Sequence, residues 1–376
     1  MSEPAGLYVH LPYCASRCGY CAFVVTTDGE SRDRYLEALE REASLVAAEA
    51  SGAPFDSVYL GGGTPSLLPP AAIARLLDAL RDRFSIDPYS EVTLESNPED
   101  VRADAVAAWR RAGVNRVSLG VQSLSDEELA AVGRRHDARR ARAALETLAP
   151  SGLSISADLI LGLPLQTRES FVRSLAGVCD SGVSHVSVYL LETEKSRTIE
   201  EDRRSHPDRY LDDDAQADLW LEAGEALLER GFLHYEISNW AQPGCEARHN
   251  VKYWTRTPTL GLGVSAHELW AQRRRANVSS LEEYLGRLGT GRRPTALDQA
   301  VGPEEAAKEE LFLGLRLAGG VSAAGIEAFV AREGDERLRS DYEGWLTTGI
   351  LAREDGRVRF TEPGFLVSNE VLSRFV

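Results

Sequence analysis

Short runs rich in Val, Leu, Ile and Tyr alternate with longer amphipathic stretches up to about residue 231, and this alternation most constrains the fold. The short runs predict strands at 6–12, 56–61, 91–96, 116–121, 155–161 and 184–191. The longer stretches predict helices at 31–50, 70–84, 99–112, 136–149, 167–181 and 212–231. Six strand–helix units imply a parallel sheet with right-handed crossovers, either an open doubly wound sheet or a partial barrel.

Polar and small residues gather where these predicted strands end. In chain order they are Cys14, Cys18 and Cys21, then Gly61 to Thr64, then Glu95 and Asn97, then Gln122 and Ser123. Only Asp158 falls inside its strand. Because parallel strands end at one edge of a sheet, we expect these residues to form a site there.

The pattern changes after residue 232. The segment 234–270 is rich in aromatic residues, His and Gly and predicts loops and short strands. A helix is predicted from residue 303, and the closing stretch predicts a hairpin that turns at Asp355-Gly356. We therefore expect a main domain at 1–232, a connecting segment at 233–302 and a small winged-helix-like domain at 303–376.

The overall charge argues against general nucleic-acid binding. Asp and Glu outnumber Lys and Arg by 58 to 42, which gives a formal net charge of −16. One local basic patch exists, but it is interpreted mainly as a solvated helix face; it comprises Arg134, Arg135, Arg139, Arg140 and Arg142. No signal peptide is visible, and no apolar run approaches the roughly 18 residues of a membrane span. We expect a cytoplasmic protein.

Three of the five cysteines, Cys14, Cys18 and Cys21, are spaced C-x3-C-x2-C. This crowding favours a metal site over a disulfide framework. Structural zinc is one interpretation, but it normally needs four ligands in two pairs. Cys179 and Cys245 are distant single residues, and His10 lies within a predicted strand.

A [4Fe–4S] cluster is the other interpretation, and thiolate-only ligation at this spacing favours it. Three thiolates leave one iron open to a small molecule that carries an amine and a carboxylate. S-adenosylmethionine (SAM) has both groups, and an electron from the cluster could then cleave its sulfonium.

The cysteine motif, with Tyr20 before its last cysteine, resembles the signature of the radical SAM superfamily, whose fold is a partial (β/α)6 barrel. Several further segments resemble the oxygen-independent coproporphyrinogen III oxidase group over nearly the whole chain: "LYVHLPYCASRCGYCAF", "YLGGGTPSLL", "TLESNPED", "VSLGVQSL", "ADLILGLPLQT" and "HYEISNWA".

This resemblance implies SAM contacts. Gly62, Gly63 and Thr64 would receive the amino end of SAM, because bare backbone allows close approach. Glu95 would accept hydrogen bonds from the ribose hydroxyls. The remaining implied contacts are Tyr8, Gln122, Arg134 and Asp158. Considered singly, without the resemblance, each of these four is better explained as an ordinary polar residue at a strand or helix end.

Two departures from the oxidases are visible. Phe23 stands where the oxidases have a further cysteine, and the motif begins at residue 14 without their preceding extension. The segment "HNVKYW" at 249–254 instead resembles the H-N-x-x-Y-W motif of a heme chaperone branch. This resemblance implies that His249 contacts heme iron and that Tyr253 and Trp254 pack against the porphyrin. Cys245 is a possible second ligand or a buried thiol, and Cys179 is expected in the core.

The sequence thus predicts a radical-SAM-type heme chaperone that carries a [4Fe–4S] cluster, SAM and heme and delivers heme to acceptor proteins, such as respiratory enzymes. Coproporphyrinogen oxidase activity is not expected. The rival hypotheses are an oxygen-independent coproporphyrinogen III oxidase and a structural zinc protein.

Overall fold

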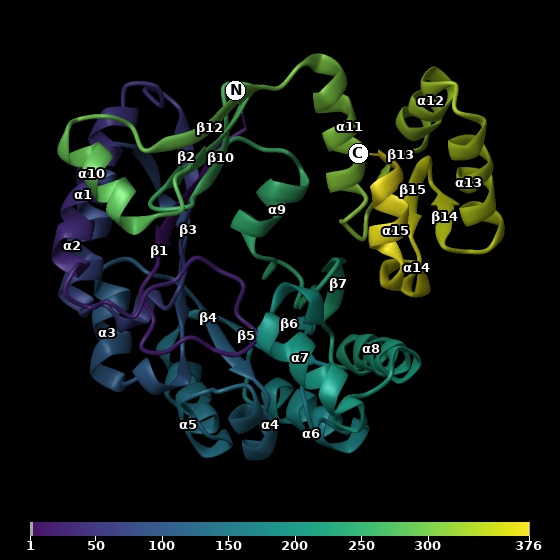
Figure 1. Cartoon of the computed structure of the whole chain (residues 1–376), viewed down its shortest axis with the longest axis horizontal. Helices are drawn as coiled ribbons and strands as arrows, with labels where there is room; N and C mark the ends of the chain where they lie inside the picture. Colours follow the sequence, from purple (N-terminus) through teal and green to yellow (C-terminus); the bar gives the residue numbers. More distant parts are fainter. Residues whose placement is uncertain (1–2, 376) are drawn as a thin grey trace.

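The computed structural model describes residues 3–375, and their largest sheet has twelve strands. Its centre consists of parallel strands that neighbour one another in chain order (Figure 1): β1 (Ala5–Leu11), β2 (Pro54–Gly62), β3 (Ser85–Ser96), β4 (Arg116–Gln122), β5 (Ser154–Leu161) and β6 (His185–Leu190). In this register Tyr8 lies beside Tyr59, and Leu94 lies beside Val117. The predicted parallel sheet is confirmed.

The predicted helices are present, mostly a few residues shorter than expected: α1 (Arg32–Val46), α2 (Pro70–Arg81), α3 (Ala103–Arg111), α5 (Ala138–Leu148), α6 (Arg168–Cys179) and α8 (Asp213–Glu229). Two further helices, α4 (Asp126–Ala131) and α7 (Arg197–Ser205), were not predicted. Helix α4 is too short for a periodic signal, and α7 buries only Ile199, so neither carries an apolar stripe.

The sheet stays open, so the fold is a partial barrel. On one side β9 (Thr259–Leu262) pairs parallel with β1, and β10 (His267–Trp270), β11 (Arg273–Asn277) and β12 (Thr295–Ala300) follow. On the other side β8 (Asn239–Ala241) pairs antiparallel with β6, and β7 (Leu233–Glu236) follows. A Cβ atom on Gly261 would lie 2.3 Å from the His267 carbonyl oxygen, so this glycine permits the tight return from β9 into β10.

The expectation of loops and short strands at 234–270 was wrong for one part, because α9 (Arg248–Trp254) is a helix. Helix α9 lies between the main sheet and α11 (Figure 1). The Glu91 carboxylate of β3 accepts hydrogen bonds from the first backbone N–H groups of α9, at 3.1 Å from Arg248 and 3.0 Å from His249. A distant strand therefore caps this helix, and no local sequence signal reports it. Helix α10 (Leu281–Gly289) follows, and the proposed division at 232/233 and 302/303 stays a prediction.

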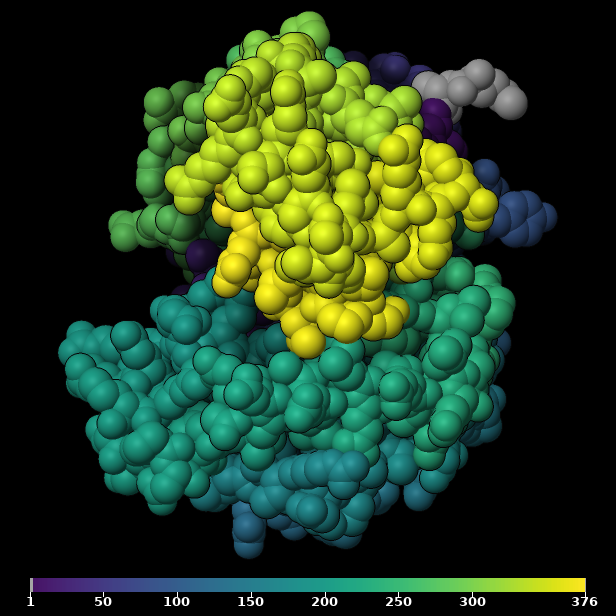
Figure 2. Space-filling view, turned by 90° about the vertical axis from the view of Figure 1, so that its right-hand side faces the viewer, coloured from purple at the N-terminus to yellow at the C-terminus, as the bar shows by residue number. Residues whose placement is uncertain are grey.

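The C-terminal part has the element order of a winged helix: α11 (Pro303–Gly314), β13 (Val321–Ser322), α12 (Ala323–Glu333), α13 (Glu336–Thr347), β14 (Leu351–Glu354) and β15 (Arg357–Phe360), then α14 (Glu362–Leu366) and α15 (Ser368–Leu372). The predicted hairpin turns at Asp355 and Gly356, both with positive φ. Backbone hydrogen bonds join this part to the β7 region, from Ile237 N to the Arg316 oxygen and from Ala318 N to the Tyr235 oxygen. Figure 2 shows it lying next to the teal surface, where α14 contacts α8.

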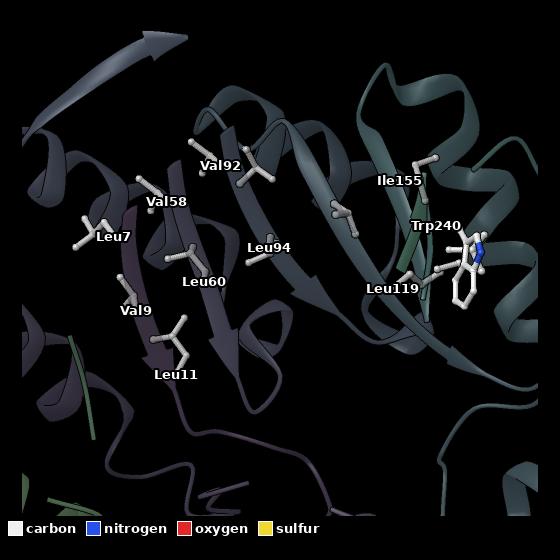
Figure 3. Packing of buried hydrophobic residues seen from close by; sticks show 14 of the residues in the cluster. Leu7, Val9, Leu11, Val58, Leu60, Val92, Leu94, Leu119, Ile155 and Trp240 are labelled. Atoms are coloured by element: carbon white, nitrogen blue, oxygen red, sulfur yellow. The ribbon is translucent and has the colours of Figure 1, made fainter. Parts of the chain in front are cut away.

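Successive side chains along each strand point to opposite faces of the sheet, and this separates the hydrophobic core from the site. Leu7, Val9 and Leu11 of β1 are buried in the hydrophobic core, as are Leu60 of β2 and Leu94 of β3 (Figure 3). The residues between them along β1 point to the opposite face of the sheet, which is the barrel interior. The core thus leaves a second face that carries polar and aromatic side chains.

Among the described residues, no helix is both long and apolar enough to cross a bilayer.

Candidate cofactor site in the barrel

The cysteine loop follows β1 and is held against it by backbone hydrogen bonds. Cys14 N donates to the Thr26 oxygen at 2.9 Å, and Thr26 N donates to the Pro12 oxygen at 2.7 Å. Cys14, Cys18 and Cys21 are half-buried free thiols. Burial raises the pKa of the Cys14 and Cys21 thiols, and the nearby cysteines raise it further. The three sulfurs therefore lie close enough to influence one another's charge.

The donor set suits iron–sulfur chemistry better than a single-ion site. The loop offers three thiols, and hydrogen-bond donors face two of them. Arg134 Nη1 lies 3.6 Å from Cys18 Sγ, and Thr64 Oγ1 lies 3.5 Å from Cys14 Sγ. Donors facing thiolate ligands are a usual feature around an iron–sulfur cluster.

Arg134 is the central polar side chain of the site. Its Nη1 also donates to Tyr20 Oη at 3.3 Å, and its Nη2 donates to Asn97 Oδ1 at 2.7 Å and to the Gly120 oxygen at 2.9 Å. The Nε atom of Arg134 is buried and has no hydrogen-bond partner. A half-buried guanidinium with one buried, unused donor fits a ligand carboxylate, which SAM carries.

The Gly61–Thr64 segment turns tightly at the end of β2. Gly62 has a φ of +109°, and a Cβ atom there would lie 2.4 Å from the His10 ring. A Cβ atom on Gly63 would lie 2.8 Å from the Tyr13 carbonyl oxygen. Thr64 N donates to that same oxygen at 2.8 Å, which anchors the segment to the cysteine loop. Only glycine allows this approach, so the backbone faces the site uncovered.

Glu95 is a half-buried carboxylate of the barrel interior. Its oxygens accept hydrogen bonds from Tyr59 Oη at 2.8 Å and from Gly62 N at 2.9 Å. Burial raises the pKa of Glu95 to about 7, although these two donors oppose the increase. Each carboxylate oxygen keeps a second acceptor position, which suits a pair of ribose hydroxyls.

Tyr8 and Asp158 face the same interior. Tyr8 Oη lies 3.0 Å from His10 Nδ1, and its ring stacks on Tyr59 with centroids 6.1 Å apart. Asp158 accepts hydrogen bonds from Ser187 Oγ at 2.7 Å and Ser118 Oγ at 3.1 Å. Burial also raises the pKa of Asp158. Its position inside β5 therefore does not separate it from the site, because its side chain points inward.

Gln122 ends β4 with a φ of +65°, a conformation that costs energy in a residue with a side chain. Its side-chain nitrogen lies 2.9 Å from where a Cβ atom on Gly120 would be, so the amide folds back over the strand end. The strained backbone and this direction place Gln122 at the same edge as Arg134.

His249 enters the barrel from the other end. Its ring is fully buried, with Nδ1 at 2.9 Å from Ser57 Oγ and Nε2 at 3.0 Å from Tyr253 Oη. The ring stacks on Tyr59 with centroids 5.2 Å apart. A Cβ atom on Gly6 would lie 3.1 Å from this ring, so Gly6 makes room for it. Burial lowers the pKa of His249 to about 3, which keeps the imidazole neutral.

The structure thus brings the predicted SAM residues together and places His249 behind them, in contact with Tyr59. Cys245 lies elsewhere. It lines a cavity of about 540 Å³ near the strand starts, together with Glu91, Arg116, Arg248 and Lys252. Cys179 ends α6 and packs against the core.

The sequence analysis did not identify Tyr59 or Ser57, and it placed Asn97 at the site without assigning it a contact. The period-2 alternation of β2 could have indicated that Ser57, Tyr59 and Gly61 share a face. No sequence signal pairs His249 with Ser57, because the two residues are 192 positions apart.

Comparison with known proteins agrees with this geometry. The model of the radical SAM superfamily matches residues 8–176. The chain is 36% identical to the heme chaperone HemW of Mycobacterium tuberculosis over 375 residues, which cover 98% of this chain and 94% of that protein. The chain belongs to the HemW family of radical SAM proteins.

Two further comparisons extend over the full length. The heme chaperone HemW of Bacillus subtilis is 30% identical, with 98% of each chain covered. The solved structure of the coproporphyrinogen III oxidase HemN of Escherichia coli superposes with a TM-score of 0.86 at 25% identity, covering all of this chain and 90% of that chain. Membership of the superfamily implies a [4Fe–4S] cluster and SAM.

Replacing Gly62 by Ala should destabilise the protein more than the same change at Gly52. Both residues have positive φ, which costs an alanine about 1–2 kcal/mol. Gly52 has no neighbour within 4 Å of a new Cβ atom, whereas Gly62 has the His10 ring at 2.4 Å, which adds about 1–3 kcal/mol of overpacking.

Thermal denaturation of the metal-free variants, followed by circular dichroism, measures this difference. Equal losses of Tm in the two variants would contradict the close contact between Gly62 and His10.

Proposed function

We propose that this protein is a cytoplasmic heme chaperone of the radical SAM type, which binds a [4Fe–4S] cluster, SAM and heme and delivers the heme to acceptor proteins, respiratory enzymes among them. The observation that carries this proposal is the joint presence of the three-cysteine loop and of the α9 segment "HNVKYW" in one barrel. Full-length similarity to proteins named heme chaperone HemW supports it.

Cys14, Cys18 and Cys21 would hold three irons of the cluster. When bound, SAM and the reduced cluster would supply the chemistry for a one-electron cleavage of the sulfonium. The SAM amino end would lie along Gly62, Gly63 and Thr64. The other SAM contacts would be Tyr8, Glu95, Gln122, Arg134 and Asp158, with Nε of Arg134 available for the carboxylate.

His249 would ligate heme iron through Nε2. The hydrogen bond between Nδ1 and Ser57 Oγ favours this, because an Nδ1–H that donates to Ser57 leaves Nε2 with a free electron pair. The low pKa of His249 keeps that pair unprotonated at neutral pH. Tyr253 Oη occupies Nε2 in the present fold, and Tyr253 is 38% exposed. Heme binding would therefore exchange the Tyr253 hydroxyl for iron from the solvent side.

Hemin titration tests the heme assignment. The wild-type protein should develop a saturable Soret band at about one heme per chain. His249→Ala should weaken hemin binding by about tenfold or more through loss of the ligand. Tyr253→Phe should strengthen it, because the phenylalanine ring cannot compete for Nε2.

His267→Ala is the matched control, since His267 is an exposed histidine on β10. An unchanged titration of His249→Ala would exclude His249 as the ligand, and weaker binding by Tyr253→Phe would contradict the exchange.

The affinity for SAM should rise with pH through about 7. Burial raises the pKa of Glu95 to about 7, so the carboxyl is mostly protonated below this pH and charged above it. The charged form accepts two ribose hydroxyls, whereas the protonated form loses an acceptor. Between pH 6 and pH 8 the apparent affinity should therefore increase about tenfold.

Equilibrium dialysis of SAM against the reconstituted protein measures this dependence. Glu95→Gln should bind more weakly and show no rise over the same range. An affinity of the wild type that falls with pH, or stays flat, would contradict a charged acceptor at Glu95.

Coproporphyrinogen III should not be converted by this protein. Phe23 stands in the cysteine loop where the oxidases have a further cysteine, and its side chain is 67% exposed. Anaerobic incubation with coproporphyrinogen III, SAM and dithionite, followed by chromatography of the oxidised porphyrins, should reveal no protoporphyrin. The Escherichia coli oxidase serves as positive control, and turnover by this chain would favour the oxidase hypothesis.

A further inference from the structure

Asn97 contacts both side chains that face cysteine sulfurs of the site, Arg134 and Thr64. It follows Ser96, the last residue of β3, and precedes Pro98. A residue before proline is restricted to extended backbone, as the φ of −97° and ψ of 152° of Asn97 show. Its Oδ1 is 2.7 Å from Arg134 Nη2, and its Nδ2 is 3.1 Å from Thr64 Oγ1. Arg134 reaches Cys18, and Thr64 reaches Cys14. One amide therefore joins both cysteine contacts.

The direction of these hydrogen bonds follows from donor chemistry. A guanidinium only donates, so the Asn97 atom that faces Arg134 must be the oxygen. The amide nitrogen of Asn97 then faces Thr64 and can only donate, so Thr64 Oγ1 accepts. The hydroxyl hydrogen of Thr64 is left free to point at Cys14 Sγ, 3.5 Å away. Every bond in the chain from Arg134 to Cys14 thus donates toward the sulfur.

We propose that Asn97 is a positioning residue that orients Thr64 and Arg134 as donors to the two sulfurs and thereby raises the reduction potential of the cluster. This inference rests on the cluster proposed above. Donors to cluster sulfurs favour the reduced cluster, which carries one more negative charge. Asn97 touches neither sulfur, and it acts only through its two neighbours.

The replacement Asn97→Asp reverses the direction of the hydrogen bond with Thr64 and keeps the hydrogen bond with Arg134. The aspartate still accepts from Arg134, but toward Thr64 it offers only an acceptor. The Thr64 hydroxyl then donates to the new carboxylate and turns away from Cys14. Thr64→Val removes the same donation from the other end. An Asn97→Asp variant also adds charge, so the two variants must be combined to separate charge from hydrogen-bond direction.

The experiment is a dithionite titration of the anaerobically reconstituted cluster, followed by electron paramagnetic resonance, with iron and sulfide measured for each variant. Asn97→Asp and Thr64→Val should each shift the midpoint potential to more negative values. The double variant should match Asn97→Asp alone, because the donation to Cys14 is lost only once.

Shifts that add in the double variant, or a wild-type potential in Asn97→Asp, would overturn the inference. Asn97→Ala is the second variant if Asn97→Asp assembles no cluster, and in this neutral background the effect of Thr64→Val should shrink; an undiminished effect would also overturn the inference. A wild-type chain that assembles no [4Fe–4S] cluster would instead remove the proposed function together with this inference.

Discussion

The parallel pairing of β1 to β6 is the constraint on which the rest of the structure depends. It ends all six strands at one edge, and it gives each strand one face toward the helices and one toward the barrel interior. Along β1, Leu7 and Val9 join the hydrophobic core, while Tyr8 points inward. The same backbone that buries the core therefore collects the polar side chains of the strands, and the segments that follow β1 and β4 add the three cysteines and Arg134.

Hydrogen bonds stabilise the charged side chains of the barrel interior. Glu95 accepts hydrogen bonds from Tyr59 and Gly62, and Asp158 accepts them from two serine hydroxyls. Arg134 donates four hydrogen bonds to neighbouring groups. Burial still raises the pKa of both carboxyl groups, because desolvation outweighs these hydrogen bonds. The unused donor of Arg134 is the exception. An unsatisfied buried donor costs free energy, so it marks the place where a ligand carboxylate would be stabilised most.

Helix α9 connects the two ends of the barrel. Its first turn is held by Glu91, its His249 ring stacks on Tyr59, and Tyr59 donates to Glu95. Tyr59 therefore connects His249, the implied heme ligand, with Glu95, the implied acceptor of the ribose hydroxyls. On the outer side, Trp254 packs against the Arg316 guanidinium at 5.2 Å, and Arg256 pairs with the buried Glu309 of α11 at 2.7 Å. The C-terminal part therefore contacts the same helix.

The amino-acid pattern by itself determined the alternation of strands and helices, the parallel sheet, the hairpin at Asp355-Gly356 and the cysteine loop. These features depend on local periodicity, turn residues and spacing, which a sequence displays directly. The tertiary structure decided what depends on contacts between distant residues. Helix α9 needs the Glu91 carboxylate from a strand far away in the chain, and His249 needs Ser57, 192 positions away, to order its ring. Likewise, the alternation of β2 places Tyr59 on the inner face, but only the packed barrel sets the Glu95 carboxylate and the His249 ring against it, because such contacts form only once the chain is folded.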